Sequence, residues 1–66
     1  MSYFEVGDKV EVIEVLAADE RANIKVGDVA KVTVVKGPSW IQCENPEWEE
    51  GYMPMREYQI KRVGCL

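Results

Sequence analysis

Residues 29–36, VAKVTVVK, decide the fold, because they are the clearest strand signal in the chain. Apolar side chains at every second position alternate with lysine and threonine, and this period of two is typical of a sheet with one wet face. The β-branched valines and threonine also favour extended backbone. We therefore expect a strand here, with Ala30, Val32 and Val34 on one face.

Shorter strands are predicted on both sides of this segment. A Gly-Pro-Ser turn follows it, and residues 40–44 then alternate with Ile41 and Cys43 on one face. On the N-terminal side, residues 9–16 alternate until the apolar phase slips after Val12, which predicts a bulge or a sharp bend within that strand.

The C-terminal part predicts two further strands separated by a proline. Pro54 cannot donate to a ladder, so we expect it to end the strand begun by Tyr52 and to start a tight helical turn. Residues 58–63 supply the last strand, and residues 17–22 are too few for a stable helix and predict a loop with at most one turn. Five short strands and no long helix predict an all-β fold, a single small five-stranded barrel over residues 1–66 with a short helical turn before the last strand.

Two similar turns precede two of these strands. Residues 5–10, EVGDKV, and residues 25–30, KVGDVA, share a Val-Gly-Asp centre. Gly-Asp pairs punctuate strands, so each segment predicts a turn that leads into a strand.

Composition limits the classes of function. Twelve acidic against eight basic residues give a net charge of −4, which disfavours a broad nucleic-acid interface. No apolar run approaches the roughly 20 residues of a membrane span, and the first residues do not resemble a signal peptide, so we expect a cytoplasmic protein without membrane contact.

Catalytic and metal-binding constellations are not expected. The chain has no histidine, and Cys43 and Cys65 stand far apart without a Cys-x-x-Cys motif, so no metal or other cofactor is predicted. The remaining candidates for catalysis are loop carboxylates such as Glu49 and Glu50, which are typical of a solvated face, and we expect a protein that is not an enzyme.

From Asn23 onward, about two-thirds of the chain, the sequence resembles the eukaryotic-type SH3 domain. Residues 24–29, IKVGDV, are similar to the turn that ends the family's RT loop, Trp40 falls where the family keeps its ligand-stacking tryptophan, and residues 51–54, GYMP, with Tyr58 resemble the segment that ends its fourth strand. The resemblance implies an SH3-like barrel. The family's Ala-Leu-Tyr-Asp-Tyr segment has no counterpart here, so half of its groove for Pro-x-x-Pro peptides is missing.

The N-terminal half resembles another group of barrels. Residues 4–12, FEVGDKVEV, are similar to the opening of KOW-like and other bacterial or phage SH3-like barrels. The two resemblances imply the same architecture but different functions.

The candidate binding residues fall into two groups. Trp40, Tyr52, Pro54 and Tyr58 are expected to form a shallow aromatic shelf for an extended peptide. An exposed acidic loop with Trp48 as its aromatic anchor is expected to form the rim, through Glu47, Glu49 and Glu50. We predict that Trp48 is exposed and waits for a partner.

Three hypotheses of function follow. The first is a stand-alone protein-binding module, monomeric or weakly dimeric, whose partner is a protein or peptide, with basic and proline-containing sequences as candidates. The second is a nucleic-acid- or ribosome-associated KOW-like barrel, for which Arg56, Lys61 and Arg62 could supply local contacts, although we favour these residues as guards of an edge strand. The third is a small phage or mobile-element protein that inhibits a host enzyme.

Overall fold

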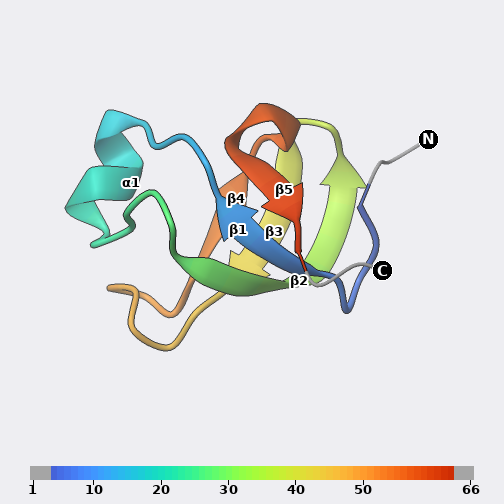
Figure 1. Cartoon of the computed structure of the whole chain (residues 1–66), viewed down its shortest axis with the longest axis horizontal. Coiled ribbons are helices and arrows are strands. Elements are labelled where there is room, and N and C mark those ends of the chain that lie inside the picture. The colour runs from blue at the N-terminus through green and yellow to red at the C-terminus, as the bar shows by residue number, and fades with distance from the viewer. Residues whose placement is uncertain (1–3, 64–66) are drawn as a thin grey trace.

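The computed structural model describes residues 4–63 and has five antiparallel strands in one sheet. The strands run in the order β4-β3-β2-β1-β5 (Figure 1). A five-residue helix, α1, and a 3-10 turn, η1, are the remaining elements of the fold. The bounds are β1 Lys9–Val12, α1 Ala17–Arg21, β2 Val29–Gly37, β3 Trp40–Glu44, β4 Tyr52–Met55, η1 Glu57–Gln59 and β5 Ile60–Arg62.

The predicted all-β fold, with five strands and a short helical turn before the last one, is confirmed. The predicted closure into a barrel is not. Within residues 4–63 the end strands β4 and β5 pair only with β3 and β1, so the sheet bends around the core but stays open. The short helical segment at residues 17–22 also agrees with the prediction of at most one turn.

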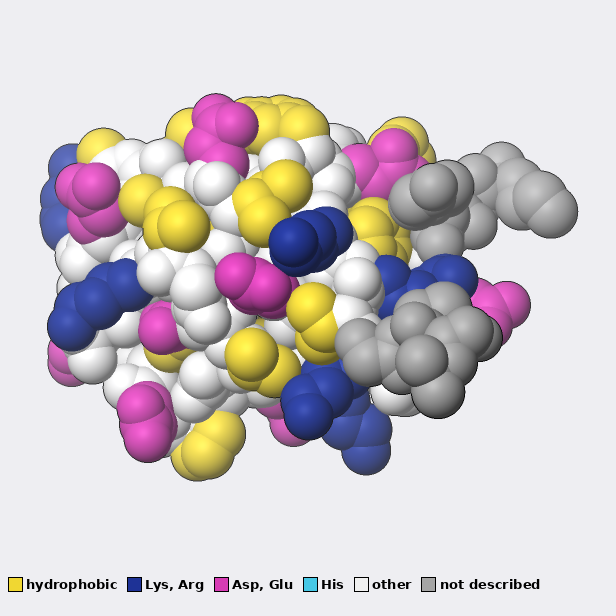
Figure 2. Space-filling model, in the orientation of Figure 1, with side chains coloured by type: hydrophobic (Ala, Val, Ile, Leu, Met, Phe, Trp, Pro, Cys, Tyr) yellow, Lys and Arg dark blue, Asp and Glu magenta, His cyan; other side chains and the backbone are white. Residues whose placement is uncertain are grey.

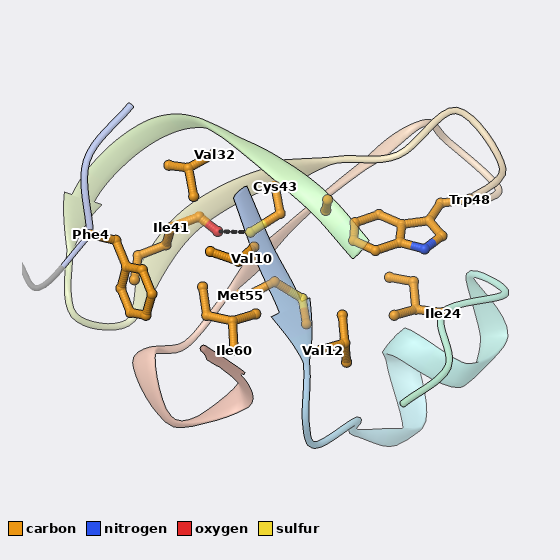
Figure 3. Packing of buried hydrophobic residues seen from close by; sticks show 11 residues of the cluster. Phe4, Val10, Val12, Ile24, Val32, Ile41, Cys43, Trp48, Met55 and Ile60 are labelled. Carbon is orange, nitrogen blue, oxygen red and sulfur yellow. Dashed lines mark hydrogen bonds between the residues drawn. The ribbon is translucent and has the colours of Figure 1, made fainter. Parts of the chain in front are cut away.

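One face of the bent sheet carries a single core. Figure 3 shows its side chains in a row that runs from Phe4 at one end to Trp48 at the other. The inward positions alternate along each strand, as the period of two requires. The buried apolar residues are Phe4, Val10, Val12, Ile24, Ala30, Val32, Ile41, Cys43, Trp48, Met55 and Ile60.

A bulge lies in β2 rather than in the first strand. The register of β2 against β3 shifts between Val32 and Val34, so that Val34 pairs with Gln42 on the outer face and Val35 packs against the core. The expected alternation is therefore correct for Ala30 and Val32 and wrong for Val34. A bulge adds one residue to a strand, and every later side chain changes face.

The first strand is shorter than predicted. It ends at Val12, and Ile13 is 44% exposed. The backbone N–H groups of Ile13 and Glu14 both donate to the Gln59 carbonyl, at 2.7 and 3.3 Å. The break in alternation after Val12 thus marks the residue at which β1 ends. The chain there leaves the sheet, and its next two residues bond to the carbonyl of the last residue of η1.

Each Val-Gly-Asp turn is held by a pair of backbone hydrogen bonds to the strand that follows the other turn. In the first turn, the backbone N–H of Gly7 donates to the Val32 carbonyl, and the backbone N–H of Val32 donates to the Asp8 carbonyl, both at 2.8 Å. In the second turn, Gly27 donates to the Val12 carbonyl, and Val12 donates to the Asp28 carbonyl, again both at 2.8 Å.

The equivalent residues of the two turns are 20 positions apart in the sequence. Val10 pairs with Ala30 at the centre of the antiparallel β1–β2 ladder, and these two residues are themselves equivalent. Residues 4–12 and 24–32 therefore form a local pseudo-two-fold repeat across β1 and β2.

Pro54 does not end its strand. It lies inside β4, paired with Gln42, and β4 continues to Met55. Since β4 is at the edge of the sheet, a residue without an N–H group is tolerated there. In the described residues, no helix has the length and apolar character required to cross a membrane.

Candidate functional site

An open groove of about 860 Å³ lies beside η1. Its apolar lining comes from Phe4, Pro38, Ile60 and the ring of Tyr58. The polar lining residues are Ser39, Arg56, Glu57, Lys61 and Arg62. Tyr58 is 51% exposed, so its ring is open to a ligand from this groove.

The position of Tyr58 is fixed by the contacts of η1. The backbone N–H of Glu57 donates to the Pro38 carbonyl at 2.8 Å, which holds η1 against the turn between β2 and β3. Trp40 follows this turn directly. The structure therefore holds η1, which carries Tyr58, against the turn that precedes Trp40.

Gln59 anchors η1 from the other side, a role that no sequence pattern predicted. The side chain is 1% exposed, and its Nε2 donates to Asp19 Oδ2 at 2.6 Å and to the Glu14 carbonyl at 3.2 Å. Its Oε1 accepts from the backbone N–H of Arg56 at 3.1 Å. A buried amide with these partners satisfies its polar atoms and holds the segment that carries Tyr58.

Trp40 and Pro54 share the outer face of the sheet. Ile41 and Cys43 point inward, so Trp40 and Gln42 point outward, and Pro54 is paired with Gln42. The indole is 36% exposed, and Lys36 Nζ lies 4.9 Å from the ring centroid, a cation–π contact. Residues diagonal to one another on a sheet face are within reach of an aromatic ring, so Trp40 and Pro54 form one surface.

We call Trp40, Pro54 and Tyr58, with the turn at Pro38 and Ser39, the Trp40–Tyr58 surface. Tyr52 is 44% exposed and lies on the same face as Pro54, but it is paired with Glu44 at the other end of β3. The structure therefore places Trp40 and Pro54 on one face of the sheet, holds η1 with Tyr58 against the turn that precedes Trp40, and leaves Tyr52 at the far end of β3.

Trp48 is not the exposed anchor that we predicted. It is 3% exposed, and its indole Nε1 donates to Asp28 Oδ2 at 3.0 Å. Figure 3 shows the ring beside Ile24, at the end of the core opposite Phe4. A tryptophan buries a large apolar area when it covers a core, and this outweighs the polar character of its sequence neighbours.

The acidic residues of the 45–51 loop remain exposed, but they do not form a rim around the aromatic shelf. The loop is attached to the end of α1 by two hydrogen bonds. The backbone N–H of Glu49 donates to the Ala22 carbonyl at 2.8 Å, and Asn23 Nδ2 donates to the Glu47 carbonyl at 3.3 Å. Figure 1 shows this loop and α1 on the same side of the molecule, away from η1. Glu47, Glu49 and Glu50 thus lie at the opposite end from Tyr58.

The groups that could take part in chemistry at the described sites are few. In residues 4–63, no three histidine, cysteine or acidic side chains are grouped as metal ligands would be. Cys43 is free and fully buried, and desolvation raises the pKa of its thiol to about 12. A thiol in this state is not a nucleophile near neutral pH. Cys65 lies outside the described residues.

Figure 2 shows that hydrophobic side chains on the visible face are separated by charged and polar groups and do not form one broad patch. Comparisons with models of protein families, with curated proteins and with solved structures found no match to this chain.

Proposed function

We propose that the chain is a protein-binding module that holds an extended segment of a partner on the Trp40–Tyr58 surface. The observation that carries this proposal is the exposure of two aromatic rings on either side of a fixed turn. Trp40 and Tyr58 are 36% and 51% exposed, whereas Phe4 and Trp48 are each 3% exposed. Burying a large ring contributes about 1.5–3 kcal/mol, so a partner that covers these two rings gains this energy.

The geometry supports an extended ligand rather than a compact one. The groove beside η1 is open to solvent, and Pro38 and Ser39, which line it, directly precede Trp40 in the chain. Proline and aromatic rims of this kind suit a peptide whose backbone is already extended. The resemblance to SH3 domains supports the same function, through Trp40, Pro54 and Tyr58.

The test is selection of ligands from random ten-residue peptides, followed by titration of the ¹⁵N-labelled chain with each recovered peptide. We expect micromolar dissociation constants, about −8 kcal/mol, with chemical-shift changes at residues 39–41 and 57–58. Trp40→Ala and Tyr58→Ala should each weaken binding at least tenfold. Val26→Ala is the matched control, because Val26 is an apolar side chain that is 61% exposed in the second Val-Gly-Asp turn.

Recovery of no peptide, or shift changes centred on Val26 or on the 45–51 loop, would refute the proposal. Circular dichroism of each variant separates lost binding from lost folding.

Two alternatives belong to the same proposal. The cations that line the groove favour a nucleic-acid-associated barrel of the KOW-like kind as the second candidate, and affinity for RNA that falls steeply with salt would support it. An inhibitor of a host enzyme, as in a phage-encoded protein of the cytoplasm, would use the same surface to occupy its target. None of these functions requires catalysis.

A further inference from the structure

We propose that the segment held by the Trp40–Tyr58 surface is acidic, with carboxylates placed next to apolar side chains. This inference rests on the proposed function and names the chemistry of the partner. It opposes the expectation of a basic partner, which depended on an exposed Trp48 within an acidic loop.

Cations stand on both sides of the exposed rings. Lys36 Nζ lies 4.9 Å from the centroid of Trp40. Arg56 directly follows Met55, the register partner of Ile41, so it lies at the strand end beside Trp40. Arg56 also lines the groove next to Tyr58.

Two further cations line the groove from β5. Lys61 has a side chain that is 58% exposed and lies 4.0 Å from Glu11, at the limit of an ion pair. Arg62 is bound more closely, with 3.0 Å between its guanidinium and Asp8 Oδ2. Lys36, Arg56 and Lys61 are thus the groups best placed to receive a carboxylate, and Arg62 contributes to the local field.

The distribution of charge over the molecule is uneven. The charged residues that line the groove are three of the eight basic residues, Arg56, Lys61 and Arg62, and one of the twelve acidic ones, Glu57. The net charge of −4 is therefore concentrated elsewhere, including the exposed 45–51 loop next to α1. A local positive field in an acidic protein attracts and orients an acidic segment.

A nucleic acid fits these observations less well. It carries a negative charge at each nucleotide, so a strand that leaves the groove would meet the acidic remainder of the surface. A short acidic peptide needs only the local cations. A second copy of the chain could offer its acidic 45–51 loop, and the self-association that this requires is a separate outcome of the test.

The test uses three blocked ten-residue peptides that share one framework of proline and leucine and differ only in carrying glutamate, lysine or serine at the remaining positions. Each is titrated into the ¹⁵N-labelled chain at low salt and again at about 0.5 M salt, where charges are screened beyond about 4 Å. We expect the glutamate peptide to bind at least tenfold more tightly than the lysine peptide, and to lose most of this advantage at high salt.

The double variant Lys36→Gln with Arg56→Gln should weaken the glutamate peptide about tenfold and leave the serine peptide unchanged. Lys25→Gln is the matched control, since Lys25 is exposed in the turn next to α1, away from η1, and its loss removes the same kind of charge. We expect no effect from it.

Equal binding of all three peptides, abolished by Trp40→Ala, would overturn the acidic partner and leave the proposed function standing. Failure of all three peptides to bind, or binding insensitive to Trp40→Ala and Tyr58→Ala, would overturn this inference, and the second result would also remove the proposed function. An RNA oligonucleotide that binds more tightly than the glutamate peptide would assign the surface to nucleic acid. Salt-sensitive self-association in sedimentation would assign it to a second copy.

Discussion

The turns at residues 5–8 and 25–28 have the same backbone and different closures. In each, the aspartate Oδ2 accepts from the N–H three residues earlier, at 2.9 Å from Glu5 and 3.0 Å from Lys25. Each glycine has a positive φ, 99° for Gly7 and 101° for Gly27, which side chains rarely adopt. The local sequence thus determines the turn.

The second partner of each aspartate distinguishes the two turns. Asp8 Oδ2 accepts from Arg62 Nε at 3.1 Å, in a pair whose side chains are 20% and 42% exposed. Asp28 Oδ2 accepts from the indole of Trp48, which is buried. The first turn is therefore held by an ion pair at the surface, and the second by a hydrogen bond from a tryptophan of the core.

The buried contact between Asp28 and Trp48 should contribute more to the free energy of unfolding than the exposed contact between Asp8 and Arg62. An exposed ion pair contributes about 0–1 kcal/mol, whereas removal of a buried aromatic side chain costs about 3–5 kcal/mol. The repeat is symmetric in its hydrogen bonds and asymmetric in its energetics.

The largest effect is expected from Trp48→Ala. It removes a buried ring and leaves Asp28 without its indole donor, so we expect a loss of about 3–5 kcal/mol in the free energy of unfolding. For a domain of this size, that lowers the thermal midpoint by more than 10 °C, measured by circular dichroism. Trp48→Phe keeps most of the apolar volume and should lose less. If Trp48→Ala unfolds within a few degrees of the parent chain, Trp48 is not part of the core in solution.

A smaller difference is expected between Asp28→Ala and Asp8→Ala. Asp28→Ala leaves a buried indole N–H without an acceptor and should cost about 2–3 kcal/mol. Asp8→Ala removes an exposed ion pair and a turn bond and should cost about 1 kcal/mol, with allowance for screening by solvent. Urea unfolding of both variants gives the two values, and equal losses would show that the closures are energetically equivalent.

The smallest effect is expected from Arg62→Gln. Its contact with Asp8 is partly exposed, so the loss should be below about 1 kcal/mol and should shrink further at 0.5 M salt. Urea unfolding at low and high salt measures this, with Lys25→Gln as a control for a simple change of charge. A loss that is large and independent of salt would mean that Arg62 stabilises the fold by packing.

The strands and turns were accessible from the sequence because their signals are local. Alternation identified residues 29–36 and 40–44, and the repeated Val-Gly-Asp identified both turns. The burial of Ile41 and Cys43 followed from the same period of two.

The errors occur where contacts distant in the sequence decide the outcome. Trp48 stands between two glutamates, and only the return of the 45–51 loop onto Ala22 places it over Ile24. The burial of Gln59 has no local signal either, because its partner Asp19 is 40 residues away. A bulge likewise depends on how two strands pair, so the phase slip after Val12 and the true bulge after Val32 could not be told apart from one strand alone.

The candidate site was predicted in composition but not in arrangement. Trp40, Pro54 and Tyr58 were predicted to share a shelf. The structure places Trp40 and Pro54 on the outer face of the sheet and holds η1, with Tyr58, against the turn before Trp40. Arg56, Lys61 and Arg62 were predicted to guard a strand edge. No sequence distance indicates that Lys36 covers Trp40 or that Arg56 lines the groove of Tyr58.

The hydrogen bonds between each Val-Gly-Asp turn and the strand that follows the other turn also have a consequence for folding. Four backbone bonds link residues 7–8 to Val32 and residues 27–28 to Val12. All four form when one loop, the segment between β1 and β2, is closed. The entropy lost on closing a loop grows slowly with its length, so this loss is incurred once and is offset by four bonds together with the β1–β2 ladder. The pseudo-two-fold repeat thus gives the first half of the chain a cooperative unit onto which β3, β4 and β5 can add.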